Sequence, residues 1–264
     1  MIELNKIHLG DAYELIKEIP DKSIDLVITD PPYFYSHHGG GCFGLKNRKH
    51  QELDVATQKQ YRKTLDELKT QHRNELTSIS YGFDFSLLDE LDRIMKKINI
   101  YIWCSKAQVR KILEHYEDKG CAIDILTWHK TNPTPTMNNT YANDTEYCIF
   151  AREKGVKVNG SYETKRKYYI TGTNKTDKDE YLHPTIKPIH IIKNLIINSS
   201  QENDVVLDCF IGSGTTAVAC KELNRQFIGF EIDEKWHKIA NERLSGLTQE
   251  DVKRKEEGQM TLFD

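Results

Sequence analysis

Long apolar runs and a strong charge of either sign are both missing from this sequence of 264 residues. Without 18 consecutive apolar residues, no membrane-spanning helix is expected. The first residues lack a basic segment followed by an apolar one, so we expect no secretory signal peptide. The formal net charge is only −3, so any binding of nucleic acid must depend on local basic patches.

Paired cysteines are missing as well. The six cysteines are scattered, include no C-x-x-C pair and often sit in apolar runs. This usage is typical of buried free thiols in a reducing compartment and argues against disulfides or a zinc site. His37 and His38 are adjacent in a glycine-rich loop without a nearby cluster of cysteines or carboxylates. An exposed loop is therefore the preferred interpretation, and no metal is expected.

Apolar runs that alternate with helical patterns occupy most of the chain. This alternation predicts an α/β fold with a mostly parallel sheet and helices on both faces. We expect a single domain over residues 1–246, interrupted by a mobile loop and helical insertion at about 34–80, and a flexible tail at 247–264. The expected strands cover residues 24–29, 98–103, 122–128, 146–151, 205–208 and 226–230.

A glycine-bearing turn follows the strand at 205–208 and opens a helix-like segment. Such a turn lets the backbone approach a ligand, and the helix start favours a negative group. Glu231 ends the next strand, about 20 residues later, where an acidic residue suits a ribose diol. No lysine follows Gly214, so this is not a phosphate-cradling loop. By itself the turn indicates only a nucleotide-binding site of unknown ligand.

A second turn follows the strand at 24–29. It reads Asp30, Pro31, Pro32, Tyr33. Two prolines cannot continue a strand, so they make a stiff turn at the carboxyl end, where open α/β sheets place their ligands.

With these two turns and the run His183-Pro184-Thr185-Ile186-Lys187-Pro188, the chain resembles the β group of S-adenosylmethionine-dependent DNA amino-methyltransferases. In that group the catalytic motif precedes the cofactor motif, as it does here. The resemblance extends from about residue 5 to 246 and implies a Rossmann-like methyltransferase fold with permuted motif order. It also implies a DNA substrate and a bacterial or phage-encoded cytoplasmic enzyme.

The resemblance implies that the turn at 30–33 is catalytic. An exocyclic amino group is a poor nucleophile because its lone pair is delocalised into the ring. The Asp30 carboxylate and the Pro31 carbonyl would accept hydrogen bonds from it, which favours an sp³ nitrogen. Tyr33 would stack on a flipped-out base, with Phe34 assisting. Core packing at a strand end is the plainer alternative for Tyr33 and Phe34.

The resemblance also implies a set of cofactor contacts. The glycine turn would wrap the methionine part of S-adenosylmethionine, Glu231 the ribose, and Asp11 the adenine. Asp233 is a second candidate for the ribose, although an acid at a helix start is the plainer interpretation. The full predicted set is Asp11, Asp30, Thr185, Lys187, Asp208, Phe210, Gly212, Ser213, Gly214, Thr215 and Glu231.

Asp as the first residue of the catalytic motif points, within the family, to the N6 amino group of adenine. Relatives that act on cytosine N4 more often begin with Ser, and cytosine N4 remains the alternative. A non-catalytic DNA-binding protein on the same scaffold is a third interpretation, against which the intact motif argues.

Sequence recognition is predicted for residues 152–182. This segment is basic and contains interleaved tyrosines, so Lys165, Arg166 and Lys167 are the predicted DNA contacts, together with Phe34. A solvated hairpin is the alternative. Four asparagines are either readers of adenine edges or turn caps: Asn132, Asn138, Asn139 and Asn143.

The end of the chain resembles the short peptide by which bacterial proteins dock on the sliding clamp, with Gln259, Leu262 and Phe263 as its anchors. A fraying terminus is the alternative. A cognate restriction endonuclease is a further predicted partner, and either a monomer or a homodimer is compatible with the sequence.

Overall fold

The computed structural model describes residues 2–33, 83–133, 141–173 and 186–246. Several predictions fall outside these ranges. They concern the insertion at 34–80 with Phe34, the asparagines Asn138 and Asn139, the cofactor residue Thr185, residues 174–182 of the recognition segment, and the tail with Gln259, Leu262 and Phe263.

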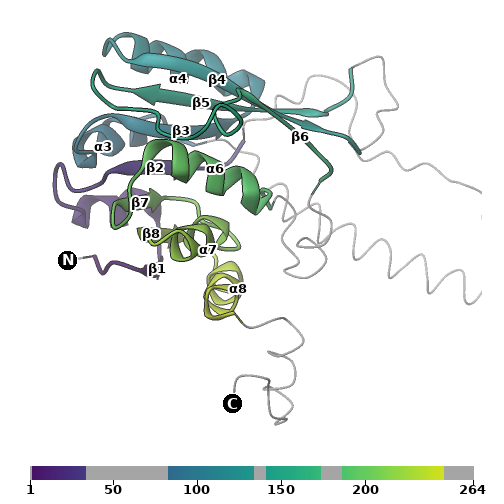
Figure 1. Cartoon of the computed structure of the whole chain (residues 1–264). Helices are drawn as coiled ribbons and strands as arrows, with labels where there is room; N and C mark the ends of the chain where they lie inside the picture. The colour runs from purple at the N-terminus through teal and green to yellow at the C-terminus, as the bar shows by residue number, and fades with distance from the viewer. Residues whose placement is uncertain (1, 34–82, 134–140, 174–185, 247–264) are drawn as a thin grey trace, which may run out of the picture.

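The centre of the molecule is one sheet of eight strands in the order β1-β8-β7-β2-β3-β5-β4-β6 (Figure 1). Every neighbouring pair is parallel except β3–β5 and β5–β4, so β5 alone runs against the others. The strands are β1 Lys6–Leu9, β2 Leu26–Thr29, β3 Asn99–Cys104, β4 Ala122–Lys130, β5 Thr145–Arg152, β6 Tyr168–Thr171, β7 Val205–Asp208 and β8 Gln226–Glu231. The predicted mostly parallel α/β sheet is confirmed.

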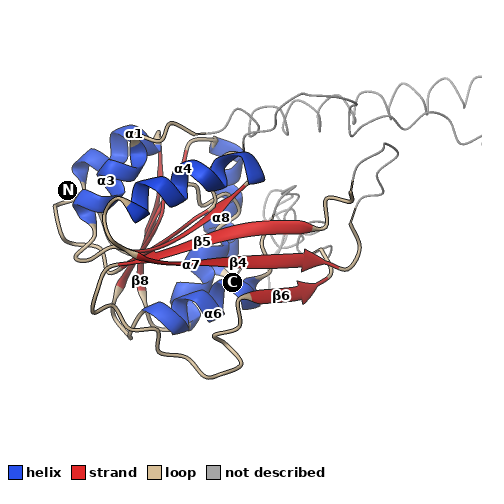
Figure 2. Cartoon of the chain, turned by 90° about the horizontal axis from the view of Figure 1, so that it is seen from above, coloured by secondary structure: helices blue, strands red, loops and turns tan. Residues whose placement is uncertain are grey.

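Helices cover both faces of this sheet (Figure 2). On one face lie α1 Ala12–Leu15, the 3-10 turn η1 Ile16–Glu18, α3 Leu87–Ile94 and α4 Lys106–Glu117. On the other face lie α6 Ile189–Ser199, α7 Thr215–Glu222 and α8 Glu234–Ser245. Each layer buries its own apolar core against the sheet. All residues of β2 and β3 are buried, which explains why these strands are continuous apolar runs in the sequence.

Residues 152–173 differ from the solvated hairpin considered above. They end in β6, which pairs in parallel with β4 as the outermost strand of the sheet. A parallel partner was not apparent from the sequence, because β6 has only four residues and alternates exposed with half-buried positions.

Five cysteines lie in the described ranges, and all five are free thiols. Four are buried, and Cys121 is partly exposed. No helix in the described ranges is long and apolar enough to cross a membrane.

Candidate active site

The two predicted turns meet at the carboxyl edge of the sheet. β2 and β7 are parallel neighbours, with Val27 paired to Leu207. From β2 the order continues to β3 on one side, and from β7 to β8 on the other. This reversal is the topological switch point at which open α/β sheets bind their ligands. Asp30 and the glycine turn therefore follow the ends of two neighbouring strands at one edge of the sheet.

Asp30 forms a buried ion pair at this edge. Its Oδ2 accepts a short charge-assisted hydrogen bond from Lys187 Nζ. Its Oδ1 is buried and has no hydrogen-bond partner in the described part of the chain. Burial raises the pKa of the Asp30 carboxyl, and the Lys187 ammonium opposes that rise. An orphaned buried acceptor is costly unless a ligand satisfies it, so Oδ1 is a candidate contact for a substrate donor.

Tyr33 closes the catalytic turn against the same lysine. Its hydroxyl donates to Glu146 Oε2 at 3.1 Å and accepts from Lys187 Nζ at 3.2 Å. The Lys187 ammonium also lies 5.4 Å from the centre of the Tyr33 ring, and 5.1 Å from that of Trp103, within the range of a cation–π contact. The hydroxyl of Tyr33 is thus held inside the protein.

Glu146 completes a balanced group of two acids and two bases. Its carboxylate lies 3.1 Å from Lys187 Nζ and 2.5 Å from Lys130 Nζ. Burial by itself would raise the pKa of Glu146, but these two ammonium groups lower it to about 2. Conversely, Asp30 and Glu146 raise the pKa of Lys187 against the effect of burial. Glu146 and Lys187 are therefore both ionised at neutral pH.

Neither Glu146 nor Lys130 was predicted as a site residue. In the sequence, Glu146 simply begins an apolar strand. It reaches the carboxyl edge because β5 is antiparallel to β3, with Tyr147 opposite Cys104. Gln108 was missed for a similar reason. It caps α4 together with Ser105, and its Nε2 donates to the Pro32 carbonyl at 2.9 Å, which supports the catalytic turn from a second element.

The glycine turn is held by Asp208. Its carboxylate is buried, accepts from the Phe210 amide at 3.1 Å and from Thr216 Oγ1 at 2.6 Å. Burial raises the pKa of Asp208 to about 7. Gly214 has φ +81°, and a Cβ there would lie 3.1 Å from Ala240 Cβ. The turn therefore packs directly on α8, and only glycine fits at this position without strain.

Ser213 and Thr215 face α8 through Arg243. This buried guanidinium donates to Thr215 Oγ1 at 2.9 Å and to Ser213 Oγ at 3.3 Å. Arg243 was missed, because in the sequence it is one more charge in a polar helix. It connects the turn to α8 and so supports the position of the turn.

Glu231 also supports the turn. Its Oε2 accepts from the Gly212 amide and its Oε1 from the Asp233 amide, both at 2.9 Å. Asp11 lies one strand away, because β1 pairs with β8 and the Gly10 amide donates to the Glu231 carbonyl at 2.8 Å. Glu231, predicted for the ribose, and Asp11, predicted for the adenine, thus lie at the ends of neighbouring strands. Asp233 caps α8, as its plainer interpretation predicted.

The predicted DNA contacts at 165–167 are not brought to this edge. Lys167 pairs with Asp124 near the start of β4, and Arg166 pairs with Glu163 at 2.7 Å. The Thr164 carbonyl accepts from Asn198 at the far end of α6. Asp124 lies six positions before Lys130 along β4, which corresponds to about 20 Å. Their contact with DNA stays a prediction.

Asn132 acts within the fold. Its Oδ1 accepts from the Thr173 amide at 2.6 Å, so it connects the end of β4 to the segment after β6. This agrees with the turn-holding interpretation for its oxygen.

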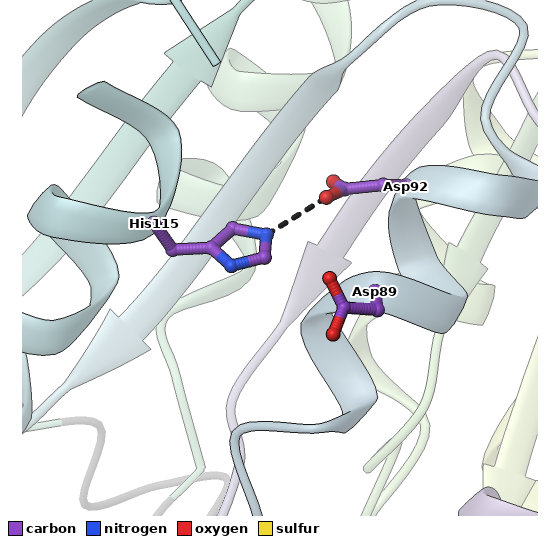
Figure 3. Close-up of side chains that lie close together, drawn as sticks. All are labelled: Asp89, Asp92 and His115. Carbon is purple, nitrogen blue, oxygen red and sulfur yellow. Dashed lines mark hydrogen bonds and ion pairs between the residues drawn. The ribbon is translucent and has the colours of Figure 1, made fainter. Parts of the chain in front are cut away.

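A second group of charged side chains lies between α3 and α4 (Figure 3). His115 Nε2 is 2.7 Å from Asp92 Oδ2, and Asp89 lies beside them. Such a set could hold a cation, but Lys119 Nζ lies 3.0 Å from Asp92 and already supplies positive charge. We interpret the group as an ionic connection between the two helices.

Comparison with known proteins agrees with this geometry. A family model described as DNA methylase, N6_N4_Mtase, matches residues 24–242. The type II methyltransferase M2.LlaDCHI of Lactococcus lactis subsp. cremoris is 31% identical over 89% of this chain and 87% of its own length. M2.MboI of Moraxella bovis is 27% identical over 92% and 88%.

Solved structures show the same fold. A complex of M1.HpyAVI with SAM superposes with a TM-score of 0.60 at 26% identity and covers 90% of this chain and 99% of its own. PvuII DNA methyltransferase, described as cytosine-N4-specific, also has a TM-score of 0.60, but at 17% identity it shows the fold alone. With the family model covering most of the chain and both motif turns placed at one switch point, this protein belongs to the N6/N4 DNA methylase family.

Proposed function

We propose that this protein transfers a methyl group from S-adenosylmethionine to the N6 amino group of adenine in a specific DNA sequence. The observation that carries the proposal is the buried Asp30 Oδ1 at the end of β2, which has no partner among the described residues. A target amino group placed beside Asp30 would supply the missing donor.

The residues at the carboxyl edge suit S-adenosylmethionine. Glu231 uses one acceptor position on each oxygen for the backbone, and a carboxylate can accept about four hydrogen bonds, so capacity for ribose hydroxyls remains. Asp11 stands on the neighbouring strand end for the adenine. The turn with Asp208, Phe210, Gly212, Ser213, Gly214 and Thr215 would enclose the methionine part. When bound, the cofactor supplies an electrophilic methyl group on a sulfonium.

The chain's own residues then act on the base. Asp30 Oδ1 and the Pro31 carbonyl would accept the two amino protons, which concentrates the lone pair on nitrogen. Tyr33 would stack on the extruded base, and stacking worth about 1–3 kcal/mol offsets part of the unstacking cost. Once the methyl is attached, the nitrogen is acidic, and Asp30 is the adjacent base. Lys187, predicted for the donor's carboxylate, instead holds Asp30 in this structure. Its contact with the donor stays a prediction, as does that of Thr185.

The choice of adenine depends on the first residue of the motif, Asp30. The fold does not select the base, because it is shared with a protein described as cytosine-N4-specific. Cytosine N4 is therefore the alternative product. The complete charged group around Lys187 supports an active enzyme over a non-catalytic scaffold.

Nucleoside mass spectrometry distinguishes these products. After incubation of unmethylated DNA with the purified protein and S-adenosylmethionine, we expect N6-methyldeoxyadenosine in the digest. The N4-methylated cytosine nucleoside would keep the mechanism and correct the base. If neither methylated nucleoside forms on single- or double-stranded DNA, the proposed function is contradicted.

The predicted DNA contacts of Lys165 and Arg166 can be tested by measuring affinity for duplexes of different lengths. If they bind a duplex, Lys165→Ala with Arg166→Ala should weaken affinity and reduce the salt slope by up to about two. Because this segment packs on the far end of α6 and the Lys167 side chain reaches Asp124, about 20 Å from Lys130 at the carboxyl edge, the loss should appear only on duplexes that extend well beyond the target base. Lys6→Ala with Lys17→Ala, two exposed ion-paired lysines, is the matched control. Unchanged affinity of the Lys165→Ala, Arg166→Ala variant on long duplexes at all salt concentrations would contradict the prediction.

We also keep three partner proposals. They are docking of the tail on a sliding clamp through Gln259, Leu262 and Phe263, a cognate restriction endonuclease, and either a monomeric or a homodimeric state. The relatives that support the second are type II methyltransferases.

A further inference from the structure

Glu146 is a buried carboxylate that contacts two parts of the catalytic group. Only 16% of its side chain is exposed. One oxygen faces Lys130 at 2.5 Å, and the other faces both Lys187 Nζ and the Tyr33 hydroxyl at 3.1 Å. It therefore reaches the catalytic aspartate through Lys187 and the stacking ring through its hydroxyl.

The effect on Asp30 follows from how Lys187 is shared. One ammonium lies between two carboxylates, so its charge is divided between Asp30 and Glu146. If the Lys187 ammonium interacted with Asp30 alone, it would polarise the Asp30 carboxylate more strongly. Asp30 would then be a weaker hydrogen-bond acceptor for a neutral amino group.

We infer that Glu146 is a positioning residue for methyl transfer. It holds the Lys187 ammonium between two carboxylates and the Tyr33 hydroxyl in place, so that Asp30 Oδ1 stays available to the target amino group. The inference rests on the proposed role of Asp30 and holds for adenine and cytosine alike.

Several ionisable groups face Asp30 besides Glu146. They are Lys187 ahead of α6, Tyr33 on its own turn, Cys104 at the end of β3 and Asp208 at the end of β7. Lys130 lies behind Glu146. All of these remain in a Glu146→Gln variant, which changes one charge without changing the size of the side chain.

The test is the pH profile of the single-turnover rate of methyl transfer. Asp30 must be ionised to accept the amino protons, so the rate falls at low pH with its pKa. Glu146 raises the pKa of Asp30 by like-charge repulsion. In Glu146→Gln we therefore expect the acid limb of the pH profile, where the rate falls at low pH, to move down by about one pH unit. We expect the rate on the plateau above that limb to fall about tenfold. Affinity for S-adenosylmethionine should be unchanged.

Two further variants separate this role from ordinary structural support. Glu146→Asp keeps the charge and should leave the acid limb near its wild-type position. Asp92→Asn removes a comparably buried carboxylate, 12% exposed, from the ionic group between α3 and α4 (Figure 3). It should lower the melting temperature without moving the limb.

The outcomes are distinct. A wild-type enzyme that methylates neither base would contradict the proposed function. An active wild type, with a folded Glu146→Gln variant whose acid limb is unmoved or moves up, would overturn the inference alone. A limb that moves equally in Asp92→Asn would overturn it too, because the shift would then be a general effect of charge.

Discussion

Replacing Asp30 with asparagine should reduce the kcat of methyl transfer by about 10²- to 10³-fold while the fold is kept. Removal of one preorganised group that stabilises a transition state has a cost of this size. Asparagine preserves the shape of the side chain but replaces an anionic acceptor by a neutral amide. It also leaves the Lys187 ammonium balanced by Glu146 alone.

This first variant is measured by transfer of labelled methyl groups to DNA, and cofactor binding is measured by calorimetry. The same strand provides a matched control. Asp25 lies just before β2, is 17% exposed and pairs with Lys96 at 2.8 Å. Asp25→Asn thus alters a similar pair at the amino end of the sheet, and should cost stability but not kcat. A fully active Asp30→Asn enzyme, or an equal loss in Asp25→Asn, would contradict the assignment of Asp30.

Substitution of Gly214 by alanine should have the second largest effect. Its backbone is left-handed, and a new Cβ would lie 3.1 Å from Ala240 Cβ and 3.2 Å from the Ala240 carbonyl oxygen. The left-handed conformation alone costs about 1–2 kcal/mol for a residue with a side chain. Displacement of the turn from α8 would add to this, and we expect the affinity for S-adenosylmethionine to fall at least about tenfold.

Gly120→Ala separates the two costs. Gly120 also has a left-handed backbone, with φ +69°, but a Cβ there meets nothing within 4 Å. The free energy of unfolding of Gly120→Ala, measured with urea, should therefore fall only by the cost of the left-handed backbone. The variant should bind the cofactor as the wild type does. Equal cofactor affinity in Gly214→Ala and the wild type would show that the turn does not enclose the cofactor.

Much of this protein could be predicted from its sequence because the relevant signals are local. The apolar run at β2 and the two prolines after it define a strand and a stiff turn without reference to any other segment. The glycine turn after β7 is equally self-contained. Their order along the chain, together with residues 183–188, was specific enough to indicate the family, which the family model then confirmed.

The chemistry around Asp30 was decided by long-range pairing. Glu146 is an ordinary residue at a strand end until the antiparallel β5 brings it beside both Lys130 and Lys187. Arg243 likewise has a role only because α8 packs under the glycine turn.

The predicted DNA contacts show the opposite case, in which residues expected near the site lie away from it. Lys165, Arg166 and Lys167 form a basic patch in the sequence, yet the start of β6 and the end of α6 place it far from the catalytic turn. Six of the eight strands, both turns and the family were predictable from the sequence, because these depend on neighbours along the chain, whereas the short strands β1 and β6 were not. Which charges share a site depends on the folded sheet, because strand direction and register determine the edge at which each side chain lies.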